Sequence, residues 1–189
     1  MAAAAADCKY ENKAEFNLGP TTAEESMVYG AARPGAKQQR CYTPELRVTA
    51  DEVAEWVDAI KAVGVTRVVS MLSDSELATY AEPLPAAMEA AFGAGKYINI
   101  NAKAPEGPAE ILKALQAATA AGDKVVVHCW GGGGRTGIAQ AAYLMASKGM
   151  SAEEAAEAVA SYAKAHGLSR RVDVAALKEF AAAAGVAKL

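Results

Sequence analysis

The sequence predicts a single α/β domain in three layers, with a mostly parallel central sheet of about four or five strands flanked by helices. Segments with apolar residues at helical spacing alternate along the chain with short runs of β-branched residues. This alternation is typical of parallel strands joined by crossover helices. The length of 189 residues suits one core of ordinary size, and the abundance of alanine favours a high helix content.

The first 25 residues differ from the rest in composition. They are rich in alanine, then polar, and they contain Gly19-Pro20, which is typical of a loosely ordered or partner-bound segment. We therefore expect a tail over residues 1–25, which offers a contact to an assembly partner, and the α/β domain over residues 26–189.

Helix signals surround two predicted strands in the first half of the domain. The box Thr49-Ala50-Asp51-Glu52 predicts a capped helix start, and the apolar residues after it keep helical spacing up to Gly64. The β-branched run over residues 65–72 predicts a buried strand. A helical stretch over 75–92, interrupted by two prolines, and a strand over 97–100 follow.

The second half contains the most strand-like segment of the chain, over residues 124–128. Before it, Pro108 opens a predicted helix that extends to Gly122. After it, glycines separate three further predicted helices, over residues 136–148, 151–166 and 172–184.

Charge and cysteine content exclude several classes of partner. The chain has 19 basic and 22 acidic residues and no basic run, so we expect neither a nucleic-acid nor a membrane partner. Its three cysteines lack the paired spacing of a zinc site or a disulfide framework, so we expect no metal and no other cofactor. The N-terminus lacks the pattern of a targeting signal, which favours a cytoplasmic location.

One glycine-rich loop carries the strongest chemical signal. Between the most strand-like run and the next predicted helix lies the segment His128-Cys129-Trp130-Gly131-Gly132-Gly133-Gly134-Arg135-Thr136-Gly137. In that position, backbone N–H groups and the positive end of the helix dipole favour an anion. The same field favours the thiolate form of Cys129, and the planar fork of Arg135 is suited to two phosphate oxygens at once.

Three other interpretations of this loop are weaker. The spacing Gly132-x-Gly134-x-x-Gly137 also satisfies the dinucleotide fingerprint, but such a loop has no use for a cysteine followed six residues later by arginine. A nucleotide P-loop requires glycine and lysine where this chain has Cys129 and Arg135. A mere tight turn does not explain four consecutive glycines, because they cost backbone entropy.

The motif His128-Cys129-(x)5-Arg135-Thr136 resembles the signature of cysteine-dependent protein tyrosine and dual-specificity phosphatases. The chain is similar to the compact branch that includes kinase-associated phosphatases, over about residues 26–182. The run 68–72 followed by the segment 76–80 also resembles the strand and helix that precede the acid loop in this family.

The resemblance implies a phosphoprotein substrate, with phosphotyrosine as the first candidate and phosphoserine and phosphothreonine as further ones, and a phosphocysteine intermediate. Cys129 would attack phosphorus and Arg135 would hold the phosphoryl oxygens, while Thr136 would donate to the thiolate and assist its departure. His128 would hydrogen-bond and shape the loop. The loop amides would bind the phosphoryl group, and Trp130 would line the pocket mouth or pack beneath it. The substrate-binding residues implied in this way are Trp130, Gly131, Gly132, Gly133 and Gly134.

Two departures from the family pattern affect the expected activity. Relatives carry a general-acid Asp at about the position of residues 102–105, where this chain has none, and Glu106 is the nearest carboxylate that would replace it. Relatives often carry a water-positioning Gln after the equivalent of Gly167, where this chain has Ser169-Arg170-Arg171. The alternative function is therefore a catalytically weak pseudophosphatase that binds phosphorylated partners or serves as a component of a larger assembly.

Overall fold

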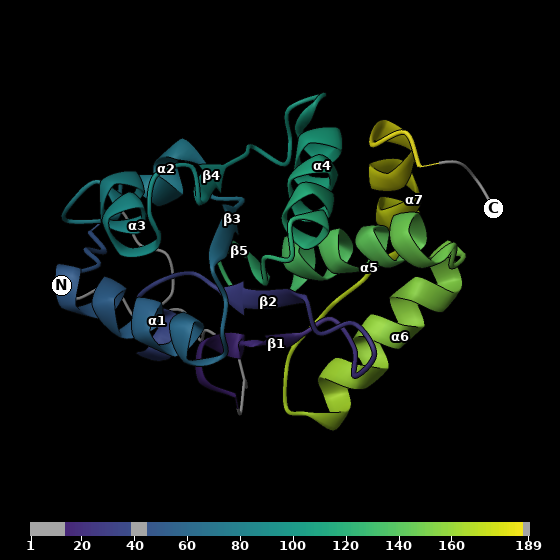
Figure 1. Cartoon of the computed structure of the whole chain (residues 1–189), viewed down its shortest axis with the longest axis horizontal. Helices are drawn as coiled ribbons and strands as arrows, with labels where there is room; N and C mark the ends of the chain where they lie inside the picture. The colour runs from purple at the N-terminus through teal and green to yellow at the C-terminus, as the bar shows by residue number, and fades with distance from the viewer. Residues whose placement is uncertain (1–13, 39–44, 187–189) are drawn as a thin grey trace, which may run out of the picture.

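A five-stranded sheet forms the centre of the molecule (Figure 1). The computed structural model describes residues 14–38 and 45–186. The strands are ordered β1-β2-β5-β3-β4. β1 is antiparallel to β2, and all other neighbours are parallel. This arrangement confirms the predicted α/β domain with a mostly parallel sheet. In chain order, the strands are β1 (Gly19–Pro20), β2 (Val28–Ala32), β3 (Arg67–Ser70), β4 (Tyr97–Asn99) and β5 (Val125–Cys129).

Helices cover both faces of the sheet, because successive residues of a strand point to opposite sides and β3 and β5 carry apolar residues on both sides. Val68 of β3 and Val126 of β5 pack with the residues of α1 and α3 in one core cluster. Val69 and Val127 point the other way and pack against α4 and α5 in a second cluster. The helices of the described residues are η1 (Glu15–Asn17), η2 (Ala36–Gln38), α1 (Ala50–Ala62), α2 (Asp74–Leu77), α3 (Leu84–Phe92), α4 (Gly107–Ala120), α5 (Gly134–Lys148), α6 (Ala152–Ala165) and α7 (Val174–Ala183).

The helix ends follow the local sequence closely. Both halves of the predicted capping box are formed by Thr49 and Glu52 at the start of α1, and a second box starts α6 at Ser151. A third box, at Ser73, starts the short helix α2. The helical stretch predicted over residues 75–92 is two helices, since α2 ends at Leu77 and α3 begins again only after the first of the two prolines.

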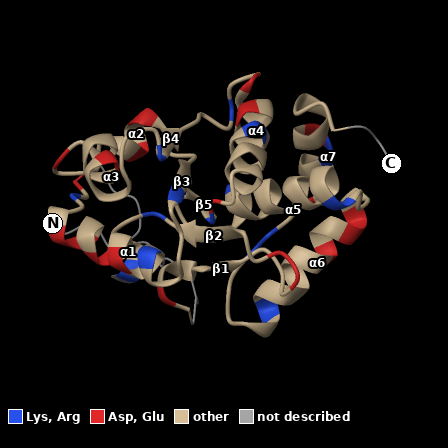
Figure 2. Ribbon diagram, viewed as in Figure 1, with Lys and Arg blue, Asp and Glu red and all other residues tan. Residues whose placement is uncertain are grey.

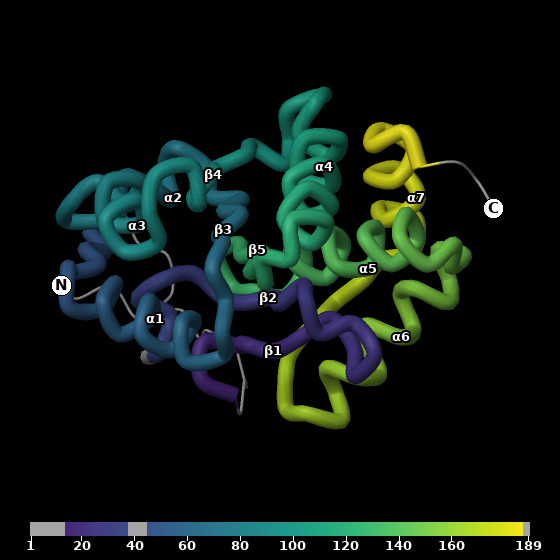
Figure 3. Tube along the Cα trace, viewed as in Figure 1, coloured from purple at the N-terminus to yellow at the C-terminus, as the bar shows by residue number. Residues whose placement is uncertain are grey.

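The domain begins earlier than the sequence predicts. Residues 14–25, assigned to the loose tail, include η1 and β1, and Phe16 and Asn17 are buried. β1 pairs with β2, while Asn17 bonds to Ser169 on the segment between α6 and α7. Figure 3 shows that segment passing the sheet beside the N-terminal strands. The boundary predicted at residue 26 therefore moves to about residue 14, and residues 1–13 of the predicted tail lie outside the described residues.

The outer helices carry mixed charge. Figure 2 shows acidic and basic residues together on α1 and on α6. In the part of the chain that the structure describes, none of the helices has both the length and the apolar character needed to cross a bilayer.

Candidate active site

The glycine-rich loop lies at the carboxyl end of the central strand, where parallel sheets commonly bind ligands. β5 is buried along its whole length and ends at Cys129, which pairs with Ala32 of β2. α5 begins five residues later, at Gly134. The sequence between them has no side chain beyond the Trp130 ring, so the loop is almost pure backbone.

Four consecutive loop carbonyls are each held by a donor from outside the loop or from α5. The Trp130 carbonyl accepts from Arg33, through its backbone N–H at 3.2 Å and its Nη1 at 3.4 Å. Asn17 Nδ2 donates to the Gly131 carbonyl at 3.1 Å. Farther along, the Gly132 carbonyl accepts from Arg170 Nη1 at 2.9 Å, and the Gly133 carbonyl accepts from the backbone N–H groups of Gly137 and Arg171.

These bonds turn the loop amides towards a common point. In a trans peptide the N–H points opposite to the C=O, so outward carbonyls at residues 130–133 leave the N–H groups of residues 131–134 pointing inward. None of these four N–H groups donates to a described residue. Gly132 has φ +70°, and a Cβ on it would lie 2.6 Å from the Ala32 backbone nitrogen, so only glycine fits there. The loop is a ready-made cradle for an anion.

The Cys129 thiol lies at the floor of this cradle and is buried. Thr136, on the first turn of α5, donates from Oγ1 to Cys129 Sγ at 3.1 Å. A donor to sulfur and the positive end of a helix both favour the thiolate over the thiol.

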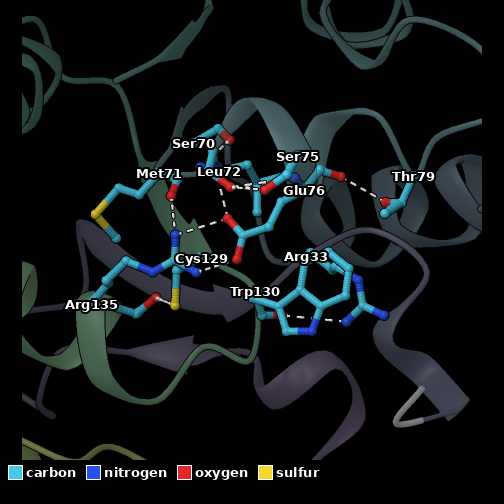
Figure 4. A network of polar contacts seen from close by, with 12 residues as sticks. Arg33, Ser70, Met71, Leu72, Ser75, Glu76, Thr79, Cys129, Trp130 and Arg135 are labelled. Atoms are coloured by element: carbon cyan, nitrogen blue, oxygen red, sulfur yellow. Dashed lines mark hydrogen bonds and ion pairs between the residues drawn. The ribbon is translucent and has the colours of Figure 1, made fainter. Parts of the chain in front are cut away.

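Arg135 lies beside the thiol, held by a carboxylate on its far edge. Its Nη2 and Nη1 donate to the two oxygens of Glu76, at 2.5 and 3.0 Å, and Nη1 also donates to the Met71 carbonyl (Figure 4). The hydrogen bonds to Glu76 and Met71 come from Nη1 and Nη2, and the guanidinium also interacts with the Cys129 side chain beside it. The edge made by Nε and Nη2 is therefore left for two oxygens of a bound anion.

Glu76 is placed by the capping box at the start of α2. Its Oε2 accepts from the Ser73 backbone N–H at 2.8 Å, which fixes the carboxylate towards Arg135. Burial raises the pKa of Glu76, but the hydrogen bonds from Arg135 and Ser73 outweigh it and hold the pKa below its usual value. Glu76 is therefore ionised at neutral pH.

A cavity of about 460 Å³ opens over the thiol. Of the described residues, those that line it are Ser73, Ser75, Glu76, Cys129, Trp130, Gly131, Gly133, Gly134, Arg135 and Arg171. Trp130 lines this cavity, and its ring stacks on the buried Arg33 guanidinium with 3.7 Å to the ring centroid (Figure 4). Gly132 and Thr136 lie behind the lining, as buried residues.

His128 differs from the prediction that its ring hydrogen-bonds. The ring is fully buried and contacts Trp56 edge-on, with 5.3 Å between the centroids. Neither nitrogen forms a hydrogen bond within the described part of the chain. The ring shapes the site by packing under the loop, and burial lowers the pKa of His128 to about 4, so the imidazole is neutral at pH 7.

Glu106, the predicted substitute acid, is not brought to the cavity. It is exposed at the N-cap of α4 and is not among the lining residues. Of the described residues around the cavity, Glu76 is the one carboxylate, and it is bound to Arg135. The described part of the cavity therefore holds no carboxyl group free to give a proton.

Four residues that matter to this geometry were missed in the sequence. Asn17, Arg33 and Arg170 hold the loop from behind, and Glu76 holds Arg135. For Glu76 a local signal existed, since Ser73-x-x-Glu76 is a capping box that fixes the carboxylate. For the other three no local pattern was available, because each lies far along the chain from the loop residue it contacts or carries no motif of its own.

A thiol beneath converging amides, with an arginine edge left open, can hold a phosphoryl group in line for attack by sulfur. That is the working arrangement of a cysteine-dependent phosphatase. Residues 109–177 match the family model described as the dual specificity phosphatase catalytic domain, and this span contains both Cys129 and Arg135. This match, together with the geometry of the site, supports a phosphatase domain of the dual-specificity and tyrosine phosphatase type.

Solved phosphatase structures share the fold. Kinase associated phosphatase (KAP), with its catalytic-site cysteine replaced by serine, has a TM-score of 0.66 at 16% identity, covering 93% of this chain and 99% of that one. PTPMT1 in complex with PI(5)P has a TM-score of 0.60 at 19% identity, covering 89% and 96%. Tk-PTP in its active form has a TM-score of 0.57 at 23% identity, covering 83% and 90%. No curated protein matches the chain.

Proposed function

We propose that this chain hydrolyses aryl phosphate esters, phosphotyrosine in proteins above all, through a phosphocysteine intermediate. The observation that carries the proposal is the convergence on one cavity of the Cys129 thiol, four inward amides and the open edge of Arg135. A dianionic phosphoryl group has three terminal oxygens to place, and these donors match them.

In the first step, Cys129 Sγ attacks phosphorus and the bond from phosphorus to the ester oxygen breaks. The loop amides and the Nε–Nη2 edge of Arg135 bind the equatorial oxygens, where charge changes during transfer. In the second step, a water oxygen attacks phosphorus and the bond to sulfur breaks, which releases inorganic phosphate. The Thr136 hydroxyl, 3.1 Å from Sγ, stabilises the sulfur anion before the first step and after the second.

The leaving oxygen decides which esters react. Glu76 is ionised and bound to Arg135, and Glu106 lies away from the cavity, so the described site offers no carboxylic acid to protonate that oxygen. A phenolic oxygen has a pKa of about 10 and leaves as an anion far more readily than an alkoxide. Phosphotyrosine should therefore react well, and phosphoserine, phosphothreonine and the inositol phosphate bound by PTPMT1 should react slowly.

The test is a panel of substrates with the full chain. We expect turnover of an aryl phosphate and of a phosphotyrosine peptide, loss of both in Cys129→Ser, and rates at least tenfold lower for a phosphoserine peptide and for PI(5)P. Glu106→Gln should change none of these rates. Robust phosphoserine turnover would overturn the substrate assignment, and its loss in Glu106→Gln would make Glu106 the acid after all. No turnover of any substrate, with binding of the phosphotyrosine peptide retained, would instead favour the phospho-binding role.

A further inference from the structure

Arg170 is a buried cation directly behind the anion cradle. Its side chain enters from the segment between α6 and α7, which is blue in Figure 2 where it passes the sheet, and the residue is only 7% exposed. All of its N–H groups find acceptors. These are Gln140 Oε1 at 2.8 Å and the carbonyls of Gly132 at 2.9 Å, Ser169 at 3.1 Å, Asn17 at 2.9 Å and Gly30 at 2.8 Å.

Every one of these acceptors is uncharged. In the described part of the chain, no carboxylate lies within ion-pair distance of Arg170. Buried charges in proteins are usually paired, because removing a charge from water without a counter-charge is costly. Burial lowers the pKa of Arg170 to about 10, an effect that the nearby Cys129 opposes, so the guanidinium still carries its charge at neutral pH.

The position of Gly30 shows how close this charge is to the reacting sulfur. A Cβ on Gly30 would lie 2.7 Å from each of three atoms, which are Arg170 Nη2, Gln140 Oε1 and Thr136 Cγ2. The three side chains therefore meet at one point on β2. Because the Thr136 hydroxyl donates to Cys129 Sγ, one side chain separates the buried cation from the thiol.

Two other titratable groups near the thiol are balanced or neutral. Arg135 is paired with Glu76, and His128 is an uncharged imidazole at pH 7. Arg33 stacks on Trp130, on the outer side of the loop. Arg171 lines the cavity, and Arg170 differs from these groups because every acceptor of its N–H groups is uncharged.

We propose that Arg170 is a positioning residue for the reaction at Cys129. The buried positive charge of Arg170 is balanced by the thiolate and by the bound phosphoryl group. Arg170 acts in two ways. The bonds to Gly132, Gly30 and Asn17 hold the loop in its anion-binding form, and the charge stabilises negative charge in the cradle. The inference rests on the proposed function in one respect, since it takes Cys129 as the nucleophile.

The charge can be cancelled without removing the arginine. Gln140→Glu keeps an oxygen acceptor for Arg170 Nε and places a counter-charge beside it, whereas Gln140→Met removes the acceptor and adds no charge. Arg170→Lys keeps the charge and loses most of the bonds. The readouts are the pH midpoint for alkylation of Cys129 by iodoacetamide and the binding of inorganic phosphate, both measured on the full chain, with circular dichroism as a check of folding.

We expect Gln140→Glu to raise the alkylation midpoint by about one pH unit and to weaken phosphate binding about tenfold. Gln140→Met should leave the midpoint within a few tenths of a unit. Arg170→Lys, where it folds, should keep the midpoint close to wild type but weaken phosphate binding, because the loop carbonyls lose their donors.

A purely structural role predicts a different result. The same alkylation midpoint in Gln140→Glu and Gln140→Met, whether shifted from wild type or not, would overturn the electrostatic role of Arg170. This failure is distinct from failure of the proposed function, which would appear in the wild-type chain itself as an alkylation midpoint at or above about 8, near that of a free thiol.

Discussion

Mild acid should destabilise the fold through His128, because its imidazole is buried where it cannot be protonated without loss. The ring lies on the central strand β5, packs against Trp56, and has no hydrogen-bond partner among the described residues. A second proton would bring a charge and another unsatisfied donor into the core. Burial accordingly lowers the pKa of His128 from 6.5 to about 4.

The size of the effect follows from the two pKa values. Between pH 6.5 and pH 4 the unfolded chain binds a proton at His128 that the folded chain does not bind, so the free energy of unfolding falls as the pH falls. The contribution is fully present above pH 6.5 and is lost down to about pH 4. At about 1.36 kcal/mol per unit, the total loss is about 3 kcal/mol, a substantial part of a typical domain's stability.

The assay is urea unfolding at several pH values between 7.5 and 4, for the wild type and for His128→Gln. Carboxylates also titrate in this range. The pKa of Glu76 is lowered in the fold, so its contribution to the free energy of unfolding is also lost as the pH falls. Both proteins share those groups, so the difference between the two pH profiles isolates His128. Parallel profiles would refute the reasoning, because they would mean that the imidazole is as easily protonated in the folded chain as in the unfolded one.

Three further predictions concern the loop and its arginine. Glu76→Gln should lower aryl phosphatase turnover by about 10- to 100-fold, since it weakens a charge-assisted pair, without shifting the basic limb of the pH profile; a shifted limb would show that Glu76 exchanges a proton with substrate. Gly132→Ala should lower the free energy of unfolding by more than about 2 kcal/mol, because the residue has a positive φ and its Cβ would clash with backbone. Gly134→Ala has open space around it and should change that free energy by less than about 0.5 kcal/mol. Similar thermal unfolding of the two variants would contradict the loop geometry. Arg135→Lys should weaken vanadate binding and reduce turnover still more, because the guanidinium fork is lost; unchanged vanadate binding would place Arg135 outside the cradle.

The parts of the fold that sequence reasoning predicted are those governed by local chemistry. The boxes at Thr49 and Ser151 fix helix starts within one turn, and the β-branched runs become β3 and β5. β1 escaped prediction because it has only two residues, one of them proline, and exists only through its pairing with β2. Its stability comes from contacts remote in sequence, which no local window contains.

The same distinction between local sequence signals and contacts remote in sequence applies to the site. The thiol, the glycines and the arginine are contiguous in sequence, so their spacing alone indicates an anion-binding loop. The residues that hold the loop are not contiguous with it. Asn17 lies 114 residues from the Gly131 carbonyl that it binds, and Arg170 lies 140 residues from the Gly30 carbonyl. A buried asparagine or arginine of this kind shows no periodicity, and only the three-dimensional fold gives it a role.

The charges in the site would affect the two steps of the proposed reaction differently. Inward amides, the Thr136 hydroxyl and the buried Arg170 cation all favour a sulfur anion. An anion that is stabilised in this way is a good leaving group, so the bond from phosphorus to sulfur needs no proton donor when it breaks in the second step. The first step has no such help at the ester oxygen, because the carboxylate in the described cavity is committed to Arg135. In the proposed reaction, the lack of a free carboxylic acid in the described cavity would therefore slow only the first step, and it would select substrates by the basicity of the oxygen that departs.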